Sequence, residues 1–413
     1  MDVNDLLPED FILPNYRDGS IANVPATVAA LLGVPFDGLA PLRAEAWKSV
    51  GGGAKRVVLL VLDAMGQNLV EQEEALFARL IQGKTAVSTH LTSVFPSTTV
   101  AAMSALWTGY APAQHGLVGL NLALPDYDTV GFMLTFRASY DNRSDTLIRA
   151  GLKPEEFLAV PGFAEQLAAA EVETHAFKSA HIIHSALSNM HGRGVAKNYP
   201  VYSFADMLVQ MRQLLEHETE KQLLVSAYWS SIDTLSHQRG WNSPATAAEL
   251  RSLIGQLQTA FLQQLSPAAC KDTVFLLVAD HGQTLIPQEK RIYLEAHPEL
   301  AEMLLLFAPG EPRTRYLYCR QGEQTAVLDY INTNLSHAAL AFKSEDVLAA
   351  GWLGPQPHAV ATPKRVGDVV VTMRDGYMLM RQSERSWADP FKATHGGLVK
   401  AEMEVPWFAL RLD

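Results

Sequence analysis

Three long apolar runs along the chain are each followed by an aspartate, and they predict neighbouring buried strands. The runs with their aspartates are 56–62 (RVVLLVL) with Asp63, 223–228 (LLVSAY) with Asp233, and 273–279 (TVFLLVA) with Asp280. Strands that are apolar on both faces are typical of the middle of a parallel sheet covered on both sides. Their carboxyl ends are where open α/β sheets place ligands, so we expect the aspartates there to face a binding site.

Helical patterns alternate with these strands. Apolar spacing and end signals predict helices over residues 66–82, 98–109, 203–217 and 243–265. The last of these begins with a serine cap and a first-turn proline at Ser243-Pro244. The alternation favours an α/β fold with helices on both faces of a mostly parallel sheet.

The segment 287–352 is more polar and carries short helix and strand patterns, which predict a small inserted α+β subdomain. The catalytic core would then comprise residues 1–286 and 353–413. Within the second part, residues 368–380 predict a hairpin that turns at Asp375-Gly376, a pair that favours tight primed turns.

Composition narrows the classes of function. The 413 residues are 48% hydrophobic and 19% charged, with a formal charge of −11 that argues against binding a nucleic-acid polymer. No run of 18 apolar residues predicts a membrane span, and the acidic N-terminus lacks a secretion pattern, so we expect a cytoplasmic protein. The two cysteines, Cys270 and Cys319, form no CxxC pattern and indicate neither a disulfide framework nor a thiolate metal site.

Three carboxylates and three imidazoles stand beside strand ends or glycine-rich loops, and they are candidate metal ligands. They are Asp63, Asp233, His237, Asp280, His281 and His395. Oxygen and nitrogen ligands without a thiolate suit Zn²⁺, with Mn²⁺ as the alternative, better than Ca²⁺. Six ligands are too many for one tetrahedral ion and suit two, and two divalent ions beside three aspartates leave a net positive site for a phosphate ester.

Each candidate ligand also has a plain structural interpretation. Asp233 and His237, four residues apart, could form a surface hydrogen bond on a helix, and Asp280-His281 could be an ordinary turn. His395, beside two glycines, could bond a buried carbonyl. Their joint occurrence at strand ends favours the metal-site interpretation.

A threonine pair, Thr98-Thr99, lies at the start of the helix expected to end near Gly109. Hydroxyls at this position lie beside unpaired N–H groups and the positive end of the helix dipole, a favourable place for a phosphate oxygen. Alone, the pair would be an ordinary helix cap. Beside two metal ions, a threonine hydroxyl could attack phosphorus in line and form a phosphoenzyme that water then hydrolyses.

At these residues the sequence strongly resembles the alkaline phosphatase superfamily, in particular its type I phosphodiesterase/nucleotide pyrophosphatase family. The motifs appear in the family's order: VLDAMG, FPSTT with WTGYAPAQHG, IDTLSH, ADHG and THGG. The resemblance implies an alkaline-phosphatase-like central sheet. It also implies two metal sites, one formed by Asp233, His237 and His395 and the other by Asp63, Asp280, His281 and the nucleophile.

The nucleophile position departs from the family pattern. Many relatives carry the hydroxyl directly before Phe-Pro-Asn, but here Val94 precedes Phe95-Pro96. Relatives place the nucleophile ten residues before the glycine that ends the helix, and Thr99 is ten residues before Gly109. Thr99 is therefore the first choice and Thr98 the second. Asn121 is the candidate for the asparagine that binds the substrate phosphate, shifted by one position.

The resemblance implies a two-metal hydrolase acting on a small phosphate ester or nucleotide, most readily a phosphodiesterase or nucleotide pyrophosphatase. The alternatives within the superfamily are a phosphomonoesterase, a phosphonate hydrolase or a phosphomutase. A sulfatase is disfavoured, because neither cysteine lies near the helix start. A catalytically silent nucleotide-binding protein is the alternative from another class, against which the complete ligand set argues.

Overall fold

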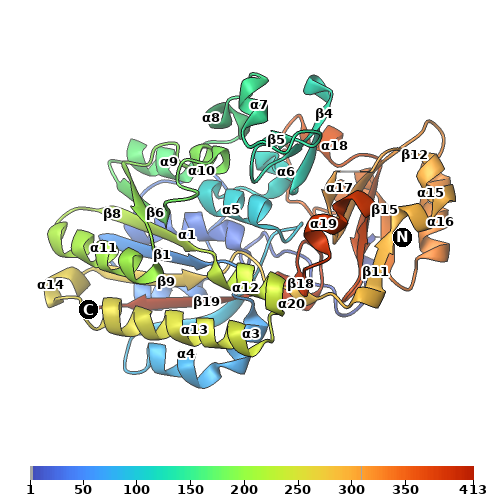
Figure 1. Ribbon diagram of the computed structural model, residues 1–413. Helices are drawn as coiled ribbons and strands as arrows, with labels where there is room; N and C mark the ends of the chain where they lie inside the picture. Colours follow the sequence, from blue (N-terminus) through green and yellow to red (C-terminus); the bar gives the residue numbers. More distant parts are fainter. Residues whose placement is uncertain (1–2, 308) are drawn as a thin grey trace.

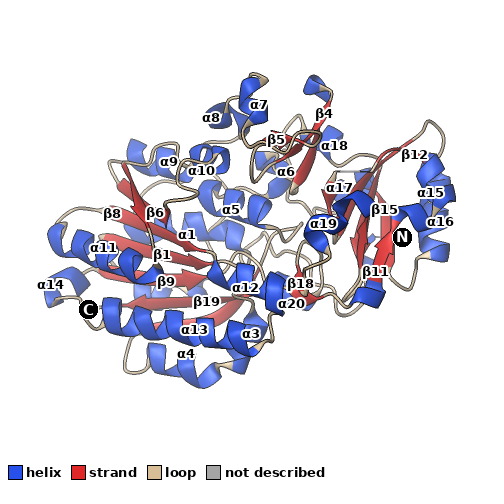
Figure 2. Cartoon of the chain, in the orientation of Figure 1, coloured by secondary structure: helices blue, strands red, loops and turns tan. Residues whose placement is uncertain are grey.

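The protein contains two large β-sheets of different kinds (Figures 1 and 2). The computed structural model describes residues 3–307 and 309–413. One sheet is mostly parallel and carries helices on both faces, as expected from the sequence, and the other is antiparallel. No helix among the described residues has the length and apolar character needed to cross a membrane.

The first sheet has seven strands in the order β2-β19-β9-β1-β8-β6-β7. Their bounds are β1 (Arg56–Leu62), β2 (Ala86–Thr92), β6 (Glu173–Ser179), β7 (Lys197–Val201), β8 (Leu223–Trp229), β9 (Thr273–Val278) and β19 (Glu404–Arg411). The three predicted strands are confirmed: β1 lies between β8 and β9, parallel to both and buried along its whole length. Strand β19 runs antiparallel to both of its neighbours.

Helices cover both faces of this sheet. On one side lie α1 (Val24–Leu32), α5 (Thr99–Thr108), α9 (Phe163–Ala169) and α10 (Ala186–His191) (Figure 1). On the other lie α3 (Gln67–Gln72), α4 (Glu74–Ile81), α11 (Phe204–His217) and α13 (Pro244–Gln256). The helix predicted over 66–82 is present as α3 and α4, which meet at Glu73. The helix predicted over 98–109 is α5, with Thr98 as its N-cap and Gly109 left-handed at φ 76°.

The second sheet is antiparallel and has the order β15-β16-β14-β13-β3-β4-β5, with β12 paired to β14. The strands are β3 (Asn121–Leu124), β4 (Thr129–Phe132), β5 (Arg137–Ala138), β12 (Leu304–Leu306), β13 (Gly310–Glu311), β14 (Thr314–Cys319), β15 (Ala339–Lys343) and β16 (Val369–Met373). Helices α15 (Pro298–Met303), α16 (Gln324–Asn334) and α17 (Ser344–Ala349) pack beside it. The division at residues 287 and 352 stays a prediction.

The hairpin predicted over 368–380 is wrong. β16 pairs with β14 and β15, whereas the strand after the turn, β17 (Met378–Met380), pairs in parallel with β11 (Arg291–Tyr293). The turn at Asp375-Gly376 exists, but the Arg313 guanidinium donates to the carbonyls of Arg374 and Tyr377 on its two sides. This buried cation holds the turn, and the strand after it pairs with β11 and not with β16.

Candidate active site

The candidate ligands converge because the three central strands end at the same edge of the parallel sheet. Asp63 directly follows β1, and Asp280 lies two residues after β9. Asp233 lies in the first turn of α12 (Ser231–Arg239), which follows β8. Since β9, β1 and β8 are parallel neighbours, their carboxyl ends bring the three carboxylates together.

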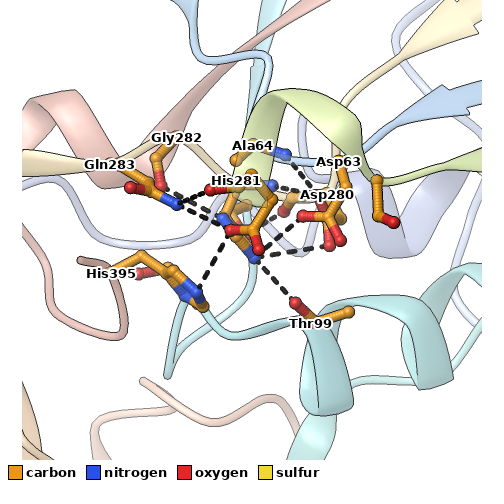
Figure 3. Close-up of polar contacts among 12 residues, drawn as sticks. Asp63, Ala64, Thr99, Asp280, His281, Gly282, Gln283 and His395 are labelled. Atoms are coloured by element: carbon orange, nitrogen blue, oxygen red, sulfur yellow. Dashed lines mark hydrogen bonds and ion pairs between the residues drawn. The ribbon is translucent and has the colours of Figure 1, made fainter. Parts of the chain in front are cut away.

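One group of side chains surrounds the imidazole of His281. Its Nε2 lies 3.5 Å from Asp63 Oδ1 and 3.4 Å from Asp280 Oδ2. The same nitrogen is 3.1 Å from the hydroxyl oxygen of Thr99. Figure 3 shows Thr99 at the start of its helix, pointing toward His281 from the side opposite the backbone of Gly282. These four side chains form the group that the family resemblance assigns to the metal beside the nucleophile.

A second group surrounds Asp233. Its Oδ1 lies 3.3 Å from His237 Nε2 and 3.7 Å from His395 Nε2. His395 reaches this point from the loop after β18 (Ala393–Thr394), and its ring stacks on that of His281 with centroids 3.7 Å apart. Because Asp233, His281 and His395 also have ligand atoms within 4.8 Å of one another, the two groups form one continuous cluster.

All three imidazoles are oriented in the same way by the main chain. Each has its Nδ1 at hydrogen-bond distance from a carbonyl oxygen: His237 from Ala393 at 2.9 Å, His281 from Gly282 at 3.1 Å, and His395 from Ser97 at 2.9 Å. A carbonyl only accepts, so each Nδ1 must donate, and in the neutral ring Nε2 then carries the lone pair. Each Nε2 faces the carboxylates, which is the arrangement that metal-binding histidines share.

The electrostatics of the cluster favour a cation. Burial and the charges of Asp280 and Asp233 raise the pKa of Asp63 well above its usual range, and burial raises the pKa of Asp280 to about 6. Burial lowers the pKa of His281 to about 4 and also lowers that of His395. These two imidazoles therefore stay neutral and leave Asp63 and Asp280 without a compensating positive charge. The pKa of His237 is instead raised, because the charge of Asp233 outweighs the effect of burial.

Two buried carboxylate oxygens indicate that the donor set fits metal ions. Asp63 Oδ1 and Asp280 Oδ2 are buried and have no hydrogen-bond donor among the described residues. The other oxygen of each carboxylate is bonded: Tyr228 donates its hydroxyl to Asp63 Oδ2, and Asp280 Oδ1 accepts from the Ala64 N–H at 3.1 Å. Buried oxygens without donors are costly unless a cation satisfies them, so these residues could hold one.

The two threonines differ in what they face. Thr99 is partly exposed, and its hydroxyl faces His281. Thr98 is only 2% exposed and faces the buried carboxyl of Glu311, whose pKa burial raises to about 8. The Thr99 hydroxyl therefore lies in the cluster of candidate ligands, whereas the Thr98 hydroxyl faces Glu311 outside it.

Asn121 is the one predicted site residue that is not joined to the cluster. It lies at the start of β3, and its side-chain amide donates to the Gly310 carbonyl at 3.0 Å. Within residues 3–307 and 309–413, no hydrogen bond connects it to Thr99 or to the six candidate ligands. Its role in binding phosphate stays a prediction.

Two residues that support the cluster were missed from the sequence. Gln283 donates its amide to Asp233 Oδ1 at 2.6 Å, and Tyr228 donates its hydroxyl to Asp63. Gln283 directly follows the Asp280-His281-Gly282 motif, and Tyr228 ends the apolar run of β8. Their closeness in sequence to these segments is the feature from which a role beside the cluster could have been predicted. Both orient a carboxylate, which is the usual role of residues just outside a metal site.

A protein-family model matches most of the chain. The model described as "Type I phosphodiesterase / nucleotide pyrophosphatase" matches residues 57–398, a range that contains every candidate ligand. A search of curated protein sequences finds no significant match.

Solved structures with the same fold include ectonucleotide pyrophosphatase/phosphodiesterase 5 and phosphonoacetate hydrolase. The murine phosphodiesterase has a TM-score of 0.64 at 16% identity, covering 85% of this chain and 87% of that one. The human protein has a TM-score of 0.63 at 17% identity, covering 86% and 87%. Phosphonoacetate hydrolase from Sinorhizobium meliloti 1021, in complex with phosphonoformate, has a TM-score of 0.62 at 16% identity, covering 86% and 90%.

Proposed function

The chain belongs to the type I phosphodiesterase/nucleotide pyrophosphatase family of the alkaline phosphatase superfamily, and from this premise we propose that it is a two-metal phosphodiesterase or nucleotide pyrophosphatase. Thr99 is the proposed nucleophile. Asp63, Asp280, His281 and Thr99 would hold one divalent ion, and Asp233, His237 and His395 the other. Zn²⁺ is the first expectation and Mn²⁺ the second.

The observation that carries this proposal is the common orientation of the three imidazoles. Each has its Nδ1 against a main-chain carbonyl and its Nε2 toward a carboxylate. A cluster selected only for folding would not need three imidazoles turned toward carboxylates and two buried carboxylate oxygens without donors. A phosphate ester needs a net positive site, which two divalent ions supply.

When bound, the two ions would lower the pKa of the Thr99 hydroxyl and stabilise charge on the attacking and leaving oxygens. Thr99 Oγ1, having lost its proton to water, would then form a bond to phosphorus as the bond from phosphorus to the leaving oxygen breaks. This yields a threonine phosphodiester that keeps the substrate's other ester group, and an alcohol or phosphate that takes up a proton from water. Water next attacks that phosphorus, the bond to Thr99 breaks, and the threonine hydroxyl is restored. Because Thr99 lies in the first turn of α5, the free N–H groups of that turn would face the phosphoryl oxygens of the substrate.

A phosphonate hydrolase is the second candidate, because a structure of that activity matches the fold with a similar score. Three further candidates are a phosphomonoesterase, a phosphomutase and a silent nucleotide-binding protein. Murine ectonucleotide pyrophosphatase/phosphodiesterase 5 has also been solved as an inactive variant in complex with AMP, so a protein of this fold binds a nucleotide.

The test compares hydrolysis of an aryl phosphodiester, the matching monoester and phosphonoacetate, with zinc and then manganese supplied. We expect the diester to have the highest kcat/KM. Preference for the monoester or the phosphonate would overturn the diesterase assignment. Metal-dependent binding of AMP without turnover of any of the three would establish the silent protein instead.

A further inference from the structure

A cavity of about 370 Å³ lies beside the end of β3 that points away from Asn121. Its walls come from the turn after β3, from helix α8 (Pro154–Phe157) and from helix α18 (Thr362–Arg365), both labelled in the upper part of Figure 1. The described residues that line it include neither Thr99 nor any of the six candidate metal ligands. Its volume is typical of sites that bind small organic molecules, so it is a candidate binding site apart from the metal cluster.

Arg365 brings a half-buried guanidinium to the wall of this cavity. Its Nη1 donates to the Gly116 carbonyl at 2.6 Å, and its Cζ lies 4.7 Å from the ring centroid of Phe157, which also lines the cavity. No carboxylate among the described residues forms an ion pair with it. Burial lowers the pKa of Arg365 to about 10, and the charge of Asp126 offsets only part of this effect. A guanidinium carries more N–H donors than the Gly116 carbonyl uses, so donors remain for a ligand.

The other charged groups of the wall determine how much negative charge the cavity would accept. Lys153 pairs with Glu156 at 2.8 Å, so the charges of these two side chains compensate each other. Lys364 and Arg365 remain as cations, and Asp126 is the single carboxylate that opposes them in the described wall. Two cations against one carboxylate leave one positive charge, which suits an anion with a single negative charge.

Apolar side chains form much of the remaining wall. Tyr127 and Val360 both line the cavity, yet they are 45% and 95% exposed. Large apolar side chains that remain exposed around one cavity are typical of a ligand site. A flat apolar body beside the ring of Phe157 would cover them and would gain the usual contacts of aromatic rings.

Helix α18 is fixed before any ligand arrives. In its first turn, the Thr362 hydroxyl donates to the Ala113 carbonyl at 2.7 Å, in α6 (Pro112–His115). At its last residue, Arg365 bonds Gly116, which directly follows α6. Because both ends of α18 are held by the same segment, a ligand would not have to order the guanidinium itself.

We propose that this cavity binds a small organic anion that has one carboxylate and a flat apolar body. The carboxylate would accept parallel N–H bonds from Arg365, and the apolar body would lie against Phe157 and Tyr127. Inorganic phosphate has no apolar surface, so it suits this wall less well. The inference concerns a site apart from the reaction and does not depend on the proposed function.

The test compares 2-naphthoate with 2-naphthamide, which has the same ring system but no charge. Their dissociation constants are measured by ligand-observed NMR titration on the zinc-loaded protein at pH 7. We expect 2-naphthoate to bind about 10- to 100-fold more tightly, as expected for hydrogen bonds between charged groups. Equal affinity for the two compounds, or binding of neither, would overturn the proposal.

Variants of Arg365 test whether this preference comes from its guanidinium. Arg365→Gln should lower the preference to below about twofold, because the charge is lost. Arg365→Lys keeps the charge but cannot form two parallel bonds, so it should retain only part of the preference, and it provides the comparison if Arg365→Gln does not fold. Arg320→Gln is the matched control, because Arg320 also donates to a main-chain carbonyl, that of Glu302 at 2.8 Å, but lies outside the cavity. A preference that survives both Arg365 variants, or one that Arg320→Gln abolishes, would contradict the proposal.

Excess inorganic phosphate distinguishes the cavity from the metal cluster, since a carboxylate could also bind metal ions. Phosphate should leave the affinity for 2-naphthoate unchanged, because no candidate metal ligand lines the cavity. Displacement of 2-naphthoate by phosphate would show that the compound binds at the metal cluster and would overturn the proposal. Neither result depends on whether the protein hydrolyses diesters.

Discussion

The hydroxyl groups of Thr98 and Thr99 are adjacent in the sequence but face different surroundings. Thr99 lies 3.1 Å from His281 Nε2, within the cluster of candidate ligands. Thr98 occupies the N-cap position of α5, where it is buried and faces Glu311. The spacing in the sequence could rank Thr99 above Thr98 as the candidate nucleophile. Only the geometry shows which of the two hydroxyls faces the candidate ligands.

We expect Thr99→Ala to lower kcat by at least about 10³-fold, because it removes the attacking oxygen. Thr98→Ala should retain part of the activity, since its hydroxyl faces away from the cluster. Steady-state kinetics on a diester check both variants, with zinc content measured to show that the site remains loaded. The reverse order of effects would move the nucleophile to Thr98.

Asp280 is the carboxylate whose replacement tests the metal site most simply. Its Oδ2 is buried without a donor, so Asp280→Asn should remove a ligand and lower zinc or manganese content. Metal analysis after dialysis measures the change. Asp141→Asn, at a carboxylate that pairs with Arg143 on the surface, is the matched control. Metal content unchanged in Asp280→Asn would contradict the ligand assignment.

At the scale of elements, continuous apolar runs predicted the central strands correctly because burial on both faces leaves few other options. Local turn chemistry was less informative, since the pair Asp375-Gly376 predicted a hairpin, whereas the strands before and after this turn pair with different partners. No pattern in the sequence indicated the contact between β6 and α5. There, Lys178 is 4% exposed, and its ammonium lies 4.7 Å from the Trp107 ring centroid.

Burial lowers the pKa of Lys178 to about 8, and no carboxylate among the described residues forms an ion pair with it. The unfolded chain, with a pKa near 10.5, binds this proton more tightly, so the free energy of unfolding should rise as pH increases from about 8 to about 10.5. Lys178→Met should therefore stabilise the protein by about 1 to 3 kcal/mol at pH 7, and the gain should shrink above pH 8.

Urea unfolding of Lys178→Met and the unmodified protein at pH 7 and pH 10 measures this gain. Lower stability of Lys178→Met at pH 7 would contradict this prediction, and so would a gain in the free energy of unfolding that does not change with pH. Either result would show that the buried ammonium does not destabilise the folded protein.

At the scale of the whole molecule, a buried ion pair connects the second sheet with the site. The Arg313 guanidinium, between β13 and β14, bonds Glu402 in α20 (Lys400–Met403) at 2.6 and 2.9 Å, with both side chains fully buried. Glu402 also accepts the Gly397 N–H at 2.9 Å, two residues after His395. Such contacts join distant segments, and a single sequence carries no signal for them. The motif order, in contrast, sufficed to predict which side chains lie together in the cluster of candidate ligands.

Glu402→Gln should leave Arg313 as an uncompensated buried charge and destabilise the protein by about 3 to 5 kcal/mol. The midpoint of urea unfolding checks this. Glu384→Gln, which affects a partly exposed partner of Arg315, should cost less. Equal midpoints for Glu402→Gln and the unmodified protein would show that the pair does not hold the two parts together.

The central claim, attack by Thr99 followed by attack by water, fixes the stereochemistry at phosphorus. The direct measurement is hydrolysis of a chiral phosphorothioate diester in ¹⁸O-labelled water, with the configuration of the product determined by NMR. Two successive in-line displacements each invert phosphorus, so the account predicts net retention. Net inversion would show that water attacks the diester directly and would contradict a covalent intermediate on Thr99.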